Sequence, residues 1–459
     1  MIRLSIIPSL AVLSCFLLAP LNAENQKPNI VLILSDDQAW TDYSFMGHPA
    51  IKTPHLDQLS QQSVTFRRGY VPTALCRPAL ASLATGLYSH QNRITGNDPG
   101  RTAKNKQHAE KTGKHPKELL IANIDQIPTL PRLLAPMGYL SFQCGKWWEG
   151  SYQRGGFSHG MTRGYPNSGG RHGDDGLTIG REGMKPVYDF IDTATAAQKP
   201  FFIWYAPFLP HTPHNPPERL LKKYTTADRP ASIAKYYAMC EWFDETCGAL
   251  LGRLDQKGLS ENTLVIYVTD NGWIQDPQGA GFALRSKLTA YEGGTRTPIM
   301  FRWLGKIKPA DRPELCSSLD IVPTILAAVG ADIPKRLPGL NLLPKLQGGD
   351  PIQRNTLFGE SFDHDIADVY DPEASLLNRW VIRGDYKLLL TYDGFSGSKY
   401  GRRTLPKDAQ PQLFNLMTDP HEITNLATQK PELVKELGGL IHGWYPLNNR
   451  KVNTLPRRK

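Results

Sequence analysis

Three short stretches of the chain are apolar at almost every position. Residues 29–34 contain the run Ile-Val-Leu-Ile-Leu, and residues 201–205 and 264–268 carry two further runs. Uninterrupted apolar runs of this length are typical of strands covered on both faces, as in a parallel sheet. Helical periodicity lies between them, as in residues 233–254, so the pattern predicts an α/β domain with a mostly parallel sheet between helices.

Polar residues follow each of the three runs. Asp36 and Asp37 follow the first, a loop rich in Pro and His follows the second, and Asp270 and Asn271 follow the third. In parallel sheets, ligands bind beyond the carboxyl ends of the strands. The pattern therefore predicts that these polar residues meet in a single site.

The remaining chain divides into a loop-rich stretch and a second region. Residues 149–183 are rich in Gly, His and Arg and too long for a plain connection, so we expect them to form a wall over the site. Short strand candidates appear near the C-terminus, at residues 356–359, 380–382 and 386–390. We predict a catalytic α/β domain over residues 24–350 and a smaller α+β domain with an antiparallel sheet over residues 351–459.

The N-terminus has the pattern of a secretory signal peptide. Arg3 precedes an apolar run at residues 4–21, and Ala23 offers a small residue at a cleavage point. We therefore expect residues 1–23 to be removed and the protein to be exported, either to the periplasm or out of the cell. The alternative, a membrane anchor, is disfavoured because Pro8 and Pro20 interrupt a run already marginal for spanning a bilayer. No later stretch is long and apolar enough to span one.

The cysteines beyond residue 23 are odd in number, namely Cys76, Cys144, Cys240, Cys247 and Cys316. An odd number in an exported protein leaves at least one thiol for another role. Cys240 and Cys247 are seven positions apart on a predicted helix, about 10 Å along its axis, which is too far for a direct bridge. We expect no disulfide framework.

Composition and charge narrow the class of partner. Hydrophobic residues make up 40% of the 459 residues, as in an ordinary globular protein, and the formal net charge is +10, which favours an acidic partner. The basic stretch at residues 101–117 has no interleaved aromatic residues and no nucleic-acid motif, so no nucleic acid is expected. A sulfated glycan would match this positive charge as well as a nucleic acid would, although charge alone does not identify the partner.

Asp36, Asp37, Asp270 and Asn271 are candidate metal ligands. Carboxylate and amide oxygens are what a hard cation such as Ca²⁺ or Mg²⁺ selects. The alternative is that each pair caps a helix or turn, as Asp and Asn often do. Two such pairs at the ends of two core strands favour the metal.

Several short motifs occur in order along the chain. They are Lys27-Pro-Asn-Ile-Val-Leu-Ile-Leu-Ser-Asp-Asp37, Cys76-Arg-Pro-Ala-Leu80, Gly145-Lys-Trp147, Pro210-His-Thr-Pro213, Val268-Thr-Asp-Asn-Gly272, and Lys287 followed by Glu292-Gly-Gly-Thr-Arg296. Together they resemble the type I, formylglycine-dependent sulfatases of the alkaline-phosphatase superfamily, over nearly the whole chain after the signal peptide. The resemblance implies an alkaline-phosphatase-like large domain that hydrolyses sulfate esters.

The resemblance also implies a role for each matched residue. The formylglycine-generating enzyme would oxidise Cys76 to formylglycine, whose hydrated aldehyde attacks the sulfur of a sulfate ester. This position and the four strand-end residues would hold the metal, Ca²⁺ rather than Mg²⁺. Lys146 and Lys287 would hold sulfate oxygens, and His211 would transfer protons. The expected substrate is a sulfated saccharide or a small sulfate ester.

Two positions depart from the family pattern. Leu80 stands where the signature has Arg, a group that the modifying enzyme recognises, so conversion of Cys76 is the step to test. Arg77 lies nearby and is a candidate for binding substrate. Trp148 stands where the family has a His.

Other histidines are candidates for the substrate pocket. His159 and His172 are expected to be ordinary loop residues; the alternative hypothesis is that one of them enters the space left by the missing His and binds substrate. We expect His214 to contact substrate, and the alternative, a zinc pair of His211 and His214, is disfavoured by the intervening Pro213.

Two other functions would use the same residues. A phosphate or phosphonate ester hydrolase could use this scaffold, and a non-catalytic homologue could bind sulfated glycans with Cys76 unconverted. The second is disfavoured because a binding module does not need Lys146, His211 and Lys287. Substrate preference is expected to reside in loops at residues 96–126 and 149–183.

Overall fold

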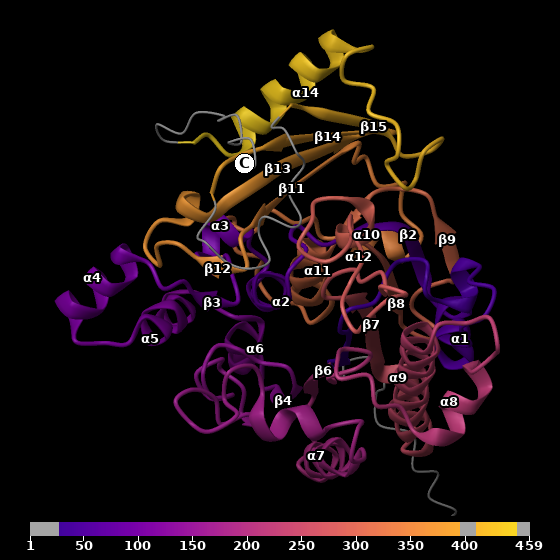
Figure 1. Ribbon diagram of the computed structural model, residues 1–459. Coiled ribbons are helices and arrows are strands. Elements are labelled where there is room, and N and C mark those ends of the chain that lie inside the picture. Colours follow the sequence, from indigo (N-terminus) through magenta and orange to yellow (C-terminus); the bar gives the residue numbers. More distant parts are fainter. Residues whose placement is uncertain (1–26, 395–409, 448–459) are drawn as a thin grey trace, which may run out of the picture.

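The computed structural model describes residues 27–394 and 410–447 (Figure 1). The predicted signal peptide, residues 1–23, lies outside them. Within the described ranges, no helix combines the length and the apolar character that crossing a bilayer requires.

The three apolar runs are adjacent strands of one sheet. Strand β1 (Asn29–Ser35) lies between β6 (Phe201–Ala206) and β7 (Thr263–Thr269) and is parallel to both. The sheet order is β10-β2-β8-β7-β1-β6-β4-β5, with β9 also beside β2. The other strands are β2 (Val64–Tyr70), β4 (Leu140–Gly145), β5 (His159–Gly160), β8 (Arg296–Arg302), β9 (Ala310–Arg312) and β10 (Cys316–Ser317). Only β8 runs antiparallel to its neighbours in this sheet as described, so the predicted mostly parallel sheet is confirmed.

Helices cover both faces of this sheet, which explains why its central strands are apolar throughout. Ile30 and Leu32 belong to a core shared with α2 (Cys76–Thr85), α6 (Leu130–Leu134) and α11 (Ile321–Ala328). Val31 and Ile33 point to the opposite face, because side chains alternate along a strand. There they join α1 (Pro54–Gln61), α7 (Lys185–Ala196) and α9 (Ala231–Gln256). The helix predicted at residues 233–254 lies within α9.

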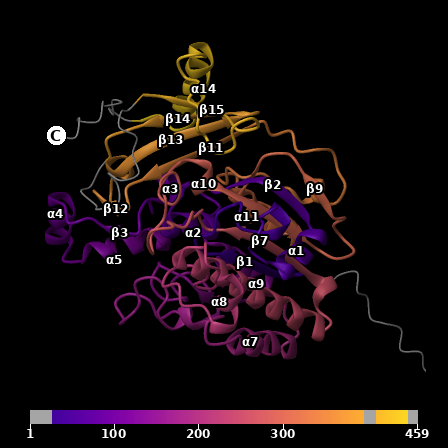
Figure 2. The same cartoon turned by 45° about the vertical axis from the view of Figure 1, so that its right-hand side comes forward.

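A second, antiparallel sheet follows near the C-terminus. Its order is β11 (Thr356–Phe362), β13 (Leu376–Arg383), β14 (Tyr386–Thr391) and β15 (Gln412–Asn415), and the three predicted strand segments fall within the first three. Helix α14 (Pro431–Trp444) covers its outer face, as Figures 1 and 2 show. Trp380 and Leu389 on the inner face pack against Tyr70 and Tyr291 of the larger part, so the two parts share a buried contact.

The stretch at residues 96–126 was predicted as a loop, and this is wrong. It contains α4 (Ala103–Thr112), α5 (Pro116–Ile121) and the short helix η3 (Ala122–Gln126). It also contains β3 (Asp98–Pro99), which pairs in parallel with β12 (Asp365–Ile366) and so joins the stretch to the C-terminal region.

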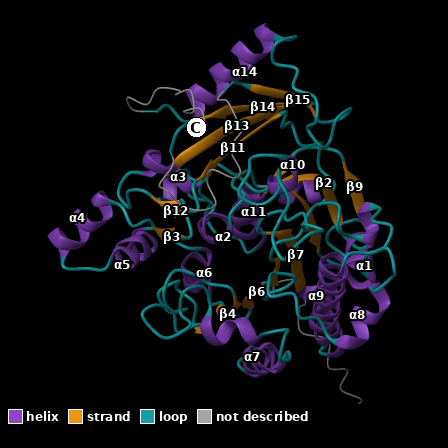
Figure 3. Ribbon diagram, in the orientation of Figure 1, coloured by secondary structure: helices purple, strands orange, loops and turns teal. Residues whose placement is uncertain are grey.

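The stretch between β4 and α7 is mostly loop, as predicted for residues 149–183 (Figure 3). The remaining α-helices within the described residues are α3 (Ser89–Asn92), α8 (Glu218–Tyr224), α10 (Glu292–Thr295) and α12 (Leu343–Leu346).

Candidate active site

The polar residues beyond β1 and β7 meet at one edge of the large sheet. The backbone N–H of Asp37 donates to Oδ1 of Asp270 (3.1 Å), and Nδ2 of Asn271 donates to Oδ1 of Asp37 (2.6 Å). All four strand-end residues, Asp36 included, are buried. The strands thus bring together residues more than 230 positions apart.

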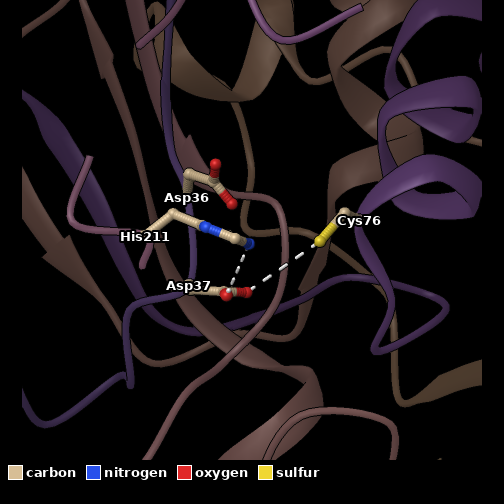
Figure 4. A group of neighbouring side chains, drawn as sticks. All are labelled: Asp36, Asp37, Cys76 and His211. Atoms are coloured by element: carbon tan, nitrogen blue, oxygen red, sulfur yellow. Dashed lines mark hydrogen bonds and ion pairs between the residues drawn. The ribbon is translucent and has the colours of Figure 1, made fainter. Parts of the chain in front are cut away.

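This cluster suits a cation. Oδ2 of Asp36, Oδ2 of Asp270 and Oδ1 of Asn271 are buried and find no hydrogen-bond partner among the described residues. Buried polar atoms are rarely left unpaired, and oxygen ligands are what Ca²⁺ and Mg²⁺ prefer. Asp36, Asp37, Cys76 and His211 each offer an atom within 4.8 Å of the others (Figure 4). The donor set therefore fits a hard divalent cation.

Cys76 is the first residue of α2 and faces this cluster. Its Sγ lies 3.0 Å from Nζ of Lys287 and 4.0 Å from Oδ1 of Asp37. Burial raises the pKa of the Cys76 thiol to about 12. The unmodified side chain is therefore a neutral thiol at neutral pH, and a neutral thiol is a poor nucleophile.

Two buried lysines neutralise the carboxylates. Nζ of Lys146, the residue after β4, lies 2.6 Å from Oδ1 of Asp36. Nζ of Lys287 lies 2.6 Å from both carboxylate oxygens of Asp37. Burial alone would lower the pKa of Lys287, but the Asp37 carboxylate outweighs it and raises that pKa. Carboxylates likewise raise the pKa of Lys146, so both lysines are charged, and both line the cavity described below.

His211 lies at the mouth of the cluster. Its Nε2 is 3.3 Å from Oδ2 of Asp37, and its Nδ1 is 2.6 Å from the carbonyl oxygen of Thr212. That carbonyl accepts the Nδ1 proton, which leaves Nε2 toward the carboxylates. The ring stacks on Phe208, with 4.3 Å between centroids.

These side chains border a cavity of about 580 Å³. Its lining comprises Cys76, Asn97, Lys146, Trp148, Arg171, His172, His211, Thr212, Trp273, Ala280, Gly281, Phe282, Lys287, Leu288, His364 and Asp365. Of the two loop histidines His159 and His172, the second lies here, with its ring 5.1 Å from that of Trp148. Burial lowers the pKa of His172 to about 3, so this ring is neutral at neutral pH.

The structure does not bring His159 and His214 to this lining. His159 lies on β5, where its ring is 5.4 Å from that of Phe190. The ring of His214 lies 5.4 Å from that of Tyr236 and 6.1 Å from that of Trp273. His214 thus lies beside Trp273, which lines the cavity, but is not itself among the lining residues.

The placement of Arg77 corrects the expectation that it binds substrate. Its guanidinium donates two bonds of 2.7 Å to the carboxylate of Glu149 and a third, of 3.2 Å, to the carbonyl oxygen of Asn97. The side chain is 1% exposed. A buried guanidinium already paired with a carboxylate is not available to a substrate.

Several lining residues were missed by the sequence reasoning. Arg171 lies over the ring of Trp148, with 4.7 Å between its guanidinium carbon and the ring centroid. Asn97, His364 and Asp365 arrive through the pairing of β3 with β12. Strands of two residues leave no periodic pattern in the sequence. The adjacent His364 and Asp365 were therefore the only sequence feature that could have indicated a functional role for this segment.

Comparison with known proteins agrees with this site. Residues 28–331 match the family model described as Sulfatase, and residues 282–438 match the model described as N-sulphoglucosamine sulphohydrolase, C-terminal. The chain is 29% identical to arylsulfatase A of Homo sapiens, over 89% of this chain and 86% of that protein. It is 32% identical to N-acetylgalactosamine-6-sulfatase of Canis lupus familiaris, over 72% of this chain and 68% of that protein.

Solved structures share the fold at lower identity. A structure described as a complex with the substrate D-glucosamine-2-N,6-O-disulfate superimposes with a TM-score of 0.68 at 19% identity, covering 91% of this chain and 97% of that one. The phosphonate monoester hydrolase of Agrobacterium radiobacter gives 0.66 at 21% identity, covering 94% and 100%. These likenesses support the predicted alkaline-phosphatase-like fold.

With the first family model matching well over half of the chain, this protein belongs to the sulfatase family and is a sulfuric ester hydrolase.

Proposed function

We propose that this enzyme hydrolyses a sulfate ester of a saccharide with a nucleophile made from Cys76. The observation that carries the proposal is the position of Cys76, whose Sγ lies 3.0 Å from Nζ of Lys287 and beside the strand-end carboxylates. A nucleophile precursor, an anion-binding lysine and a cation-binding cluster thus share one wall of the cavity. The neutral thiol is unsuited to this task, so the side chain must first be modified.

The modification is the oxidation of Cys76 to formylglycine. The Cβ–S bond and one C–H bond are replaced by a C=O bond, and the sulfur leaves as H₂S. This is a two-electron oxidation: the thiol would lose two electrons and two protons to an oxidant used by the formylglycine-generating enzyme, and water would supply the aldehyde oxygen as H₂S leaves. The resulting aldehyde adds water to give two hydroxyl groups on one carbon.

Turnover then takes place in two steps. One hydroxyl attacks sulfur and releases its proton, the S–O bond to the alcohol breaks, and the alcohol oxygen leaves with the electron pair and takes up a proton. The second hydroxyl then loses its proton, the C–O bond to sulfate breaks, and the aldehyde is restored. Lys146 and Lys287 would hold the sulfate oxygens, and His211 would accept the proton from the second hydroxyl.

The metal would be held by Asp36, Asp37, Asp270 and Asn271, with an oxygen on residue 76. When bound, Ca²⁺ would supply positive charge that polarises the sulfate group and the attacking hydroxyl. Ca²⁺ is preferred to Mg²⁺ because a site rich in carboxylates suits its larger shell of oxygen ligands.

The substrate class is inferred from charge and from the relatives. Arg171, Lys146 and Lys287 line the cavity, and the chain carries a net charge of +10, so an anionic saccharide is complementary. Names of relatives include a sulfatase of N-acetylgalactosamine 6-sulfate. From the signal peptide predicted at residues 1–23, we expect this substrate in the periplasm or outside the cell.

The test has two parts. The protein is produced together with a formylglycine-generating enzyme, and the peptide containing Cys76 is analysed by mass spectrometry. Aryl sulfate and aryl phosphate are then assayed side by side, with Cys76→Ala as the control. We expect formylglycine at position 76 and faster hydrolysis of the aryl sulfate than of the aryl phosphate. Faster phosphate or phosphonate hydrolysis would favour the alternative represented by the Agrobacterium hydrolase, and binding of sulfated glycans without turnover would favour a non-catalytic homologue.

A further inference from the structure

A second cavity, of about 520 Å³, is formed by β3 and by the first turns of α4 and α5. It is built from the basic stretch at residues 101–117, which neither the metal cluster nor the proposed nucleophile uses. Its lining includes the cationic residues Arg101, Lys106 and Lys117, and Asp98 is its one acidic residue. This excess of positive charge favours an anionic ligand.

The carboxylate of Asp98 is already shared by two cations. Nζ of Lys117 lies 3.3 Å from its Oδ1, and Nε and Nη2 of Arg171 lie 2.8 and 2.5 Å from its Oδ2. Burial alone would raise the pKa of Asp98, but the two cations outweigh it and lower that pKa. Asp98 is therefore charged and paired, and it does not repel an anion as a free carboxylate would.

Arg101 and Lys106 supply the positive charge that is left over. Both residues are exposed. Nζ of Lys106 lies 3.8 Å from Oε1 of Glu110, but the side chains are 79% and 67% exposed, and a pair of this kind is weak. Lys106 is therefore available to an anion in the cavity.

The two cations that share Asp98 are held in place before any ligand binds. Nζ of Lys117 lies over the ring of Tyr165, 5.6 Å from its centroid, and the guanidinium of Arg171 lies over the ring of Trp148. Side chains that are already oriented lose little freedom when a ligand binds. The wall of the second cavity is therefore more than a set of mobile surface lysines.

The second cavity adjoins the active-site cavity. Asn97 lines the active-site cavity, and the next residue, Asp98, lines the second one. Arg171 spans the boundary, because it lines the first cavity and binds Asp98 of the second. Figures 1 and 2 both show β3 and β12 between α2, which begins with Cys76, and the pair α4 and α5. A chain molecule with one end in the active-site cavity can therefore extend past Arg171 into the second cavity.

We propose that the second cavity binds a further anionic sugar of an oligosaccharide whose sulfate ester lies in the active-site cavity. This rests on the proposed hydrolysis of sulfated saccharides, and it narrows the substrate class to chains of several sugars. Arg101 and Lys106 bind the sulfate or carboxylate groups of the added sugar, and Arg171 lies at the junction. A single sulfated sugar reaches only the first cavity and so binds more weakly.

The test measures how inhibition depends on the length of a saccharide. Wild type, produced with a formylglycine-generating enzyme, hydrolyses 4-nitrophenyl sulfate in the presence of heparin or chondroitin sulfate fragments, from disaccharide to hexasaccharide. Competitive inhibition of the initial rate shows that a fragment occupies the active-site cavity. In at least one series we expect the inhibition constant to fall by about tenfold from disaccharide to tetrasaccharide, because the added sugar gains charge-assisted hydrogen bonds.

Two double variants locate the effect. Arg101→Ala with Lys106→Ala should lose the dependence on length, so that the tetrasaccharide inhibits no better than the disaccharide. Lys111→Ala with Lys114→Ala is the matched control, because it removes the same charge from exposed positions of the same stretch that do not line the cavity. This control should keep the dependence on length. Each inhibition constant is calculated with the variant's own KM, and circular dichroism checks that each variant folds.

The possible results separate the inference from the proposed function. Equal losses in the two double variants would assign the effect to the general charge of the stretch and overturn the inference. Inhibition that is independent of length in both series would also overturn it, and tight binding of a short single-stranded DNA would then identify a nucleic-acid surface. Wild type without activity on 4-nitrophenyl sulfate would overturn the proposed function and this inference with it.

Discussion

Arg77 and Glu149 form a bidentate ion pair inside the protein, with both nitrogen–oxygen distances at 2.7 Å. Their side chains are 1% and 3% exposed. Arg77 follows Cys76 on α2, and Glu149 belongs to the loop that carries Lys146. The pair therefore ties the helix that carries the nucleophile to the loop that carries an anion-binding lysine.

Breaking this pair should destabilise the protein strongly. Glu149→Ala leaves a buried guanidinium without its carboxylate, and such a change costs about 3–5 kcal/mol of unfolding free energy. Urea unfolding followed by circular dichroism measures it. The control is Asp175→Ala, because the Arg163–Asp175 pair is 58% and 62% exposed and should contribute less than about 1 kcal/mol. Equal costs for the two variants would contradict the prediction.

Calcium should stabilise the folded enzyme. An ion that binds only the folded state raises Tm, so chelator-treated wild type should gain Tm when Ca²⁺ is added. Asp270→Asn removes a charge from the cluster and should reduce this gain. Asp57→Asn is the control, since its carboxylate binds Ser44 and the backbone of Phe45, away from the site. Asp57→Asn should lower Tm but keep the full increase in Tm on adding Ca²⁺. An increase in Asp270→Asn as large as that of wild type would argue against the metal site.

The two loop histidines should respond differently to truncation. His172→Ala removes a ring from the cavity wall beside Trp148, so kcat/KM for an aryl sulfate should fall by about tenfold, a loss of about 1.4 kcal/mol of transition-state binding. His159→Ala should leave kcat/KM unchanged, because His159 is on β5 and its ring lies against Phe190 of α7. Steady-state kinetics measures both. No loss in His172→Ala would remove this residue from the site.

Asp244 should make stability fall as pH rises. Its carboxylate accepts bonds from the backbone N–H groups of Leu56 (2.8 Å) and His55 (3.2 Å), and burial raises its pKa from 3.8 to about 7. Between about pH 4 and pH 7 the folded protein therefore binds more protons than the unfolded chain. The stability that this group contributes is present below about pH 4 and is lost as pH rises toward about 7.

Asp244→Asn removes this titration. The unfolding free energy of wild type minus that of the variant should fall across this range, by at most about 1.4 kcal/mol per pH unit. Urea unfolding at several pH values measures it, with the exposed Asp189→Asn as the control. A difference that does not change with pH would contradict the role of Asp244.

The centre of the fold was predictable from hydrophobic pattern alone. A strand buried on both faces must be apolar throughout, so β1, β6 and β7 were recognisable, and the polar residues that end them were conspicuous. The roles of Lys146 and Lys287 followed only from the family resemblance, because a lysine that pairs with a buried carboxylate looks in sequence like any surface lysine.

The rest of the site depends on contacts that leave no local signal. Asn97 and His364 are 267 positions apart and meet through strands of two residues each. Arg77 was expected to face the substrate because its partner, Glu149, is 72 positions away and nothing near either residue indicates the pairing. Long-range partners of single polar side chains were thus the main gap in the prediction.

The cavity wall that β3 and β12 form has a consequence for how such an enzyme diversifies. The strand-end carboxylates and Lys146 directly follow strands of the large sheet, and Lys287 lies in the loop before α10. His364 and Asp365 stand on a segment outside the large sheet, held by the pairing with β3 and by further hydrogen bonds such as those from Asn105 and Thr102. Both residues line the cavity, so we expect substitutions there to reshape one of its walls while the strand-end carboxylates keep their places beyond β1 and β7.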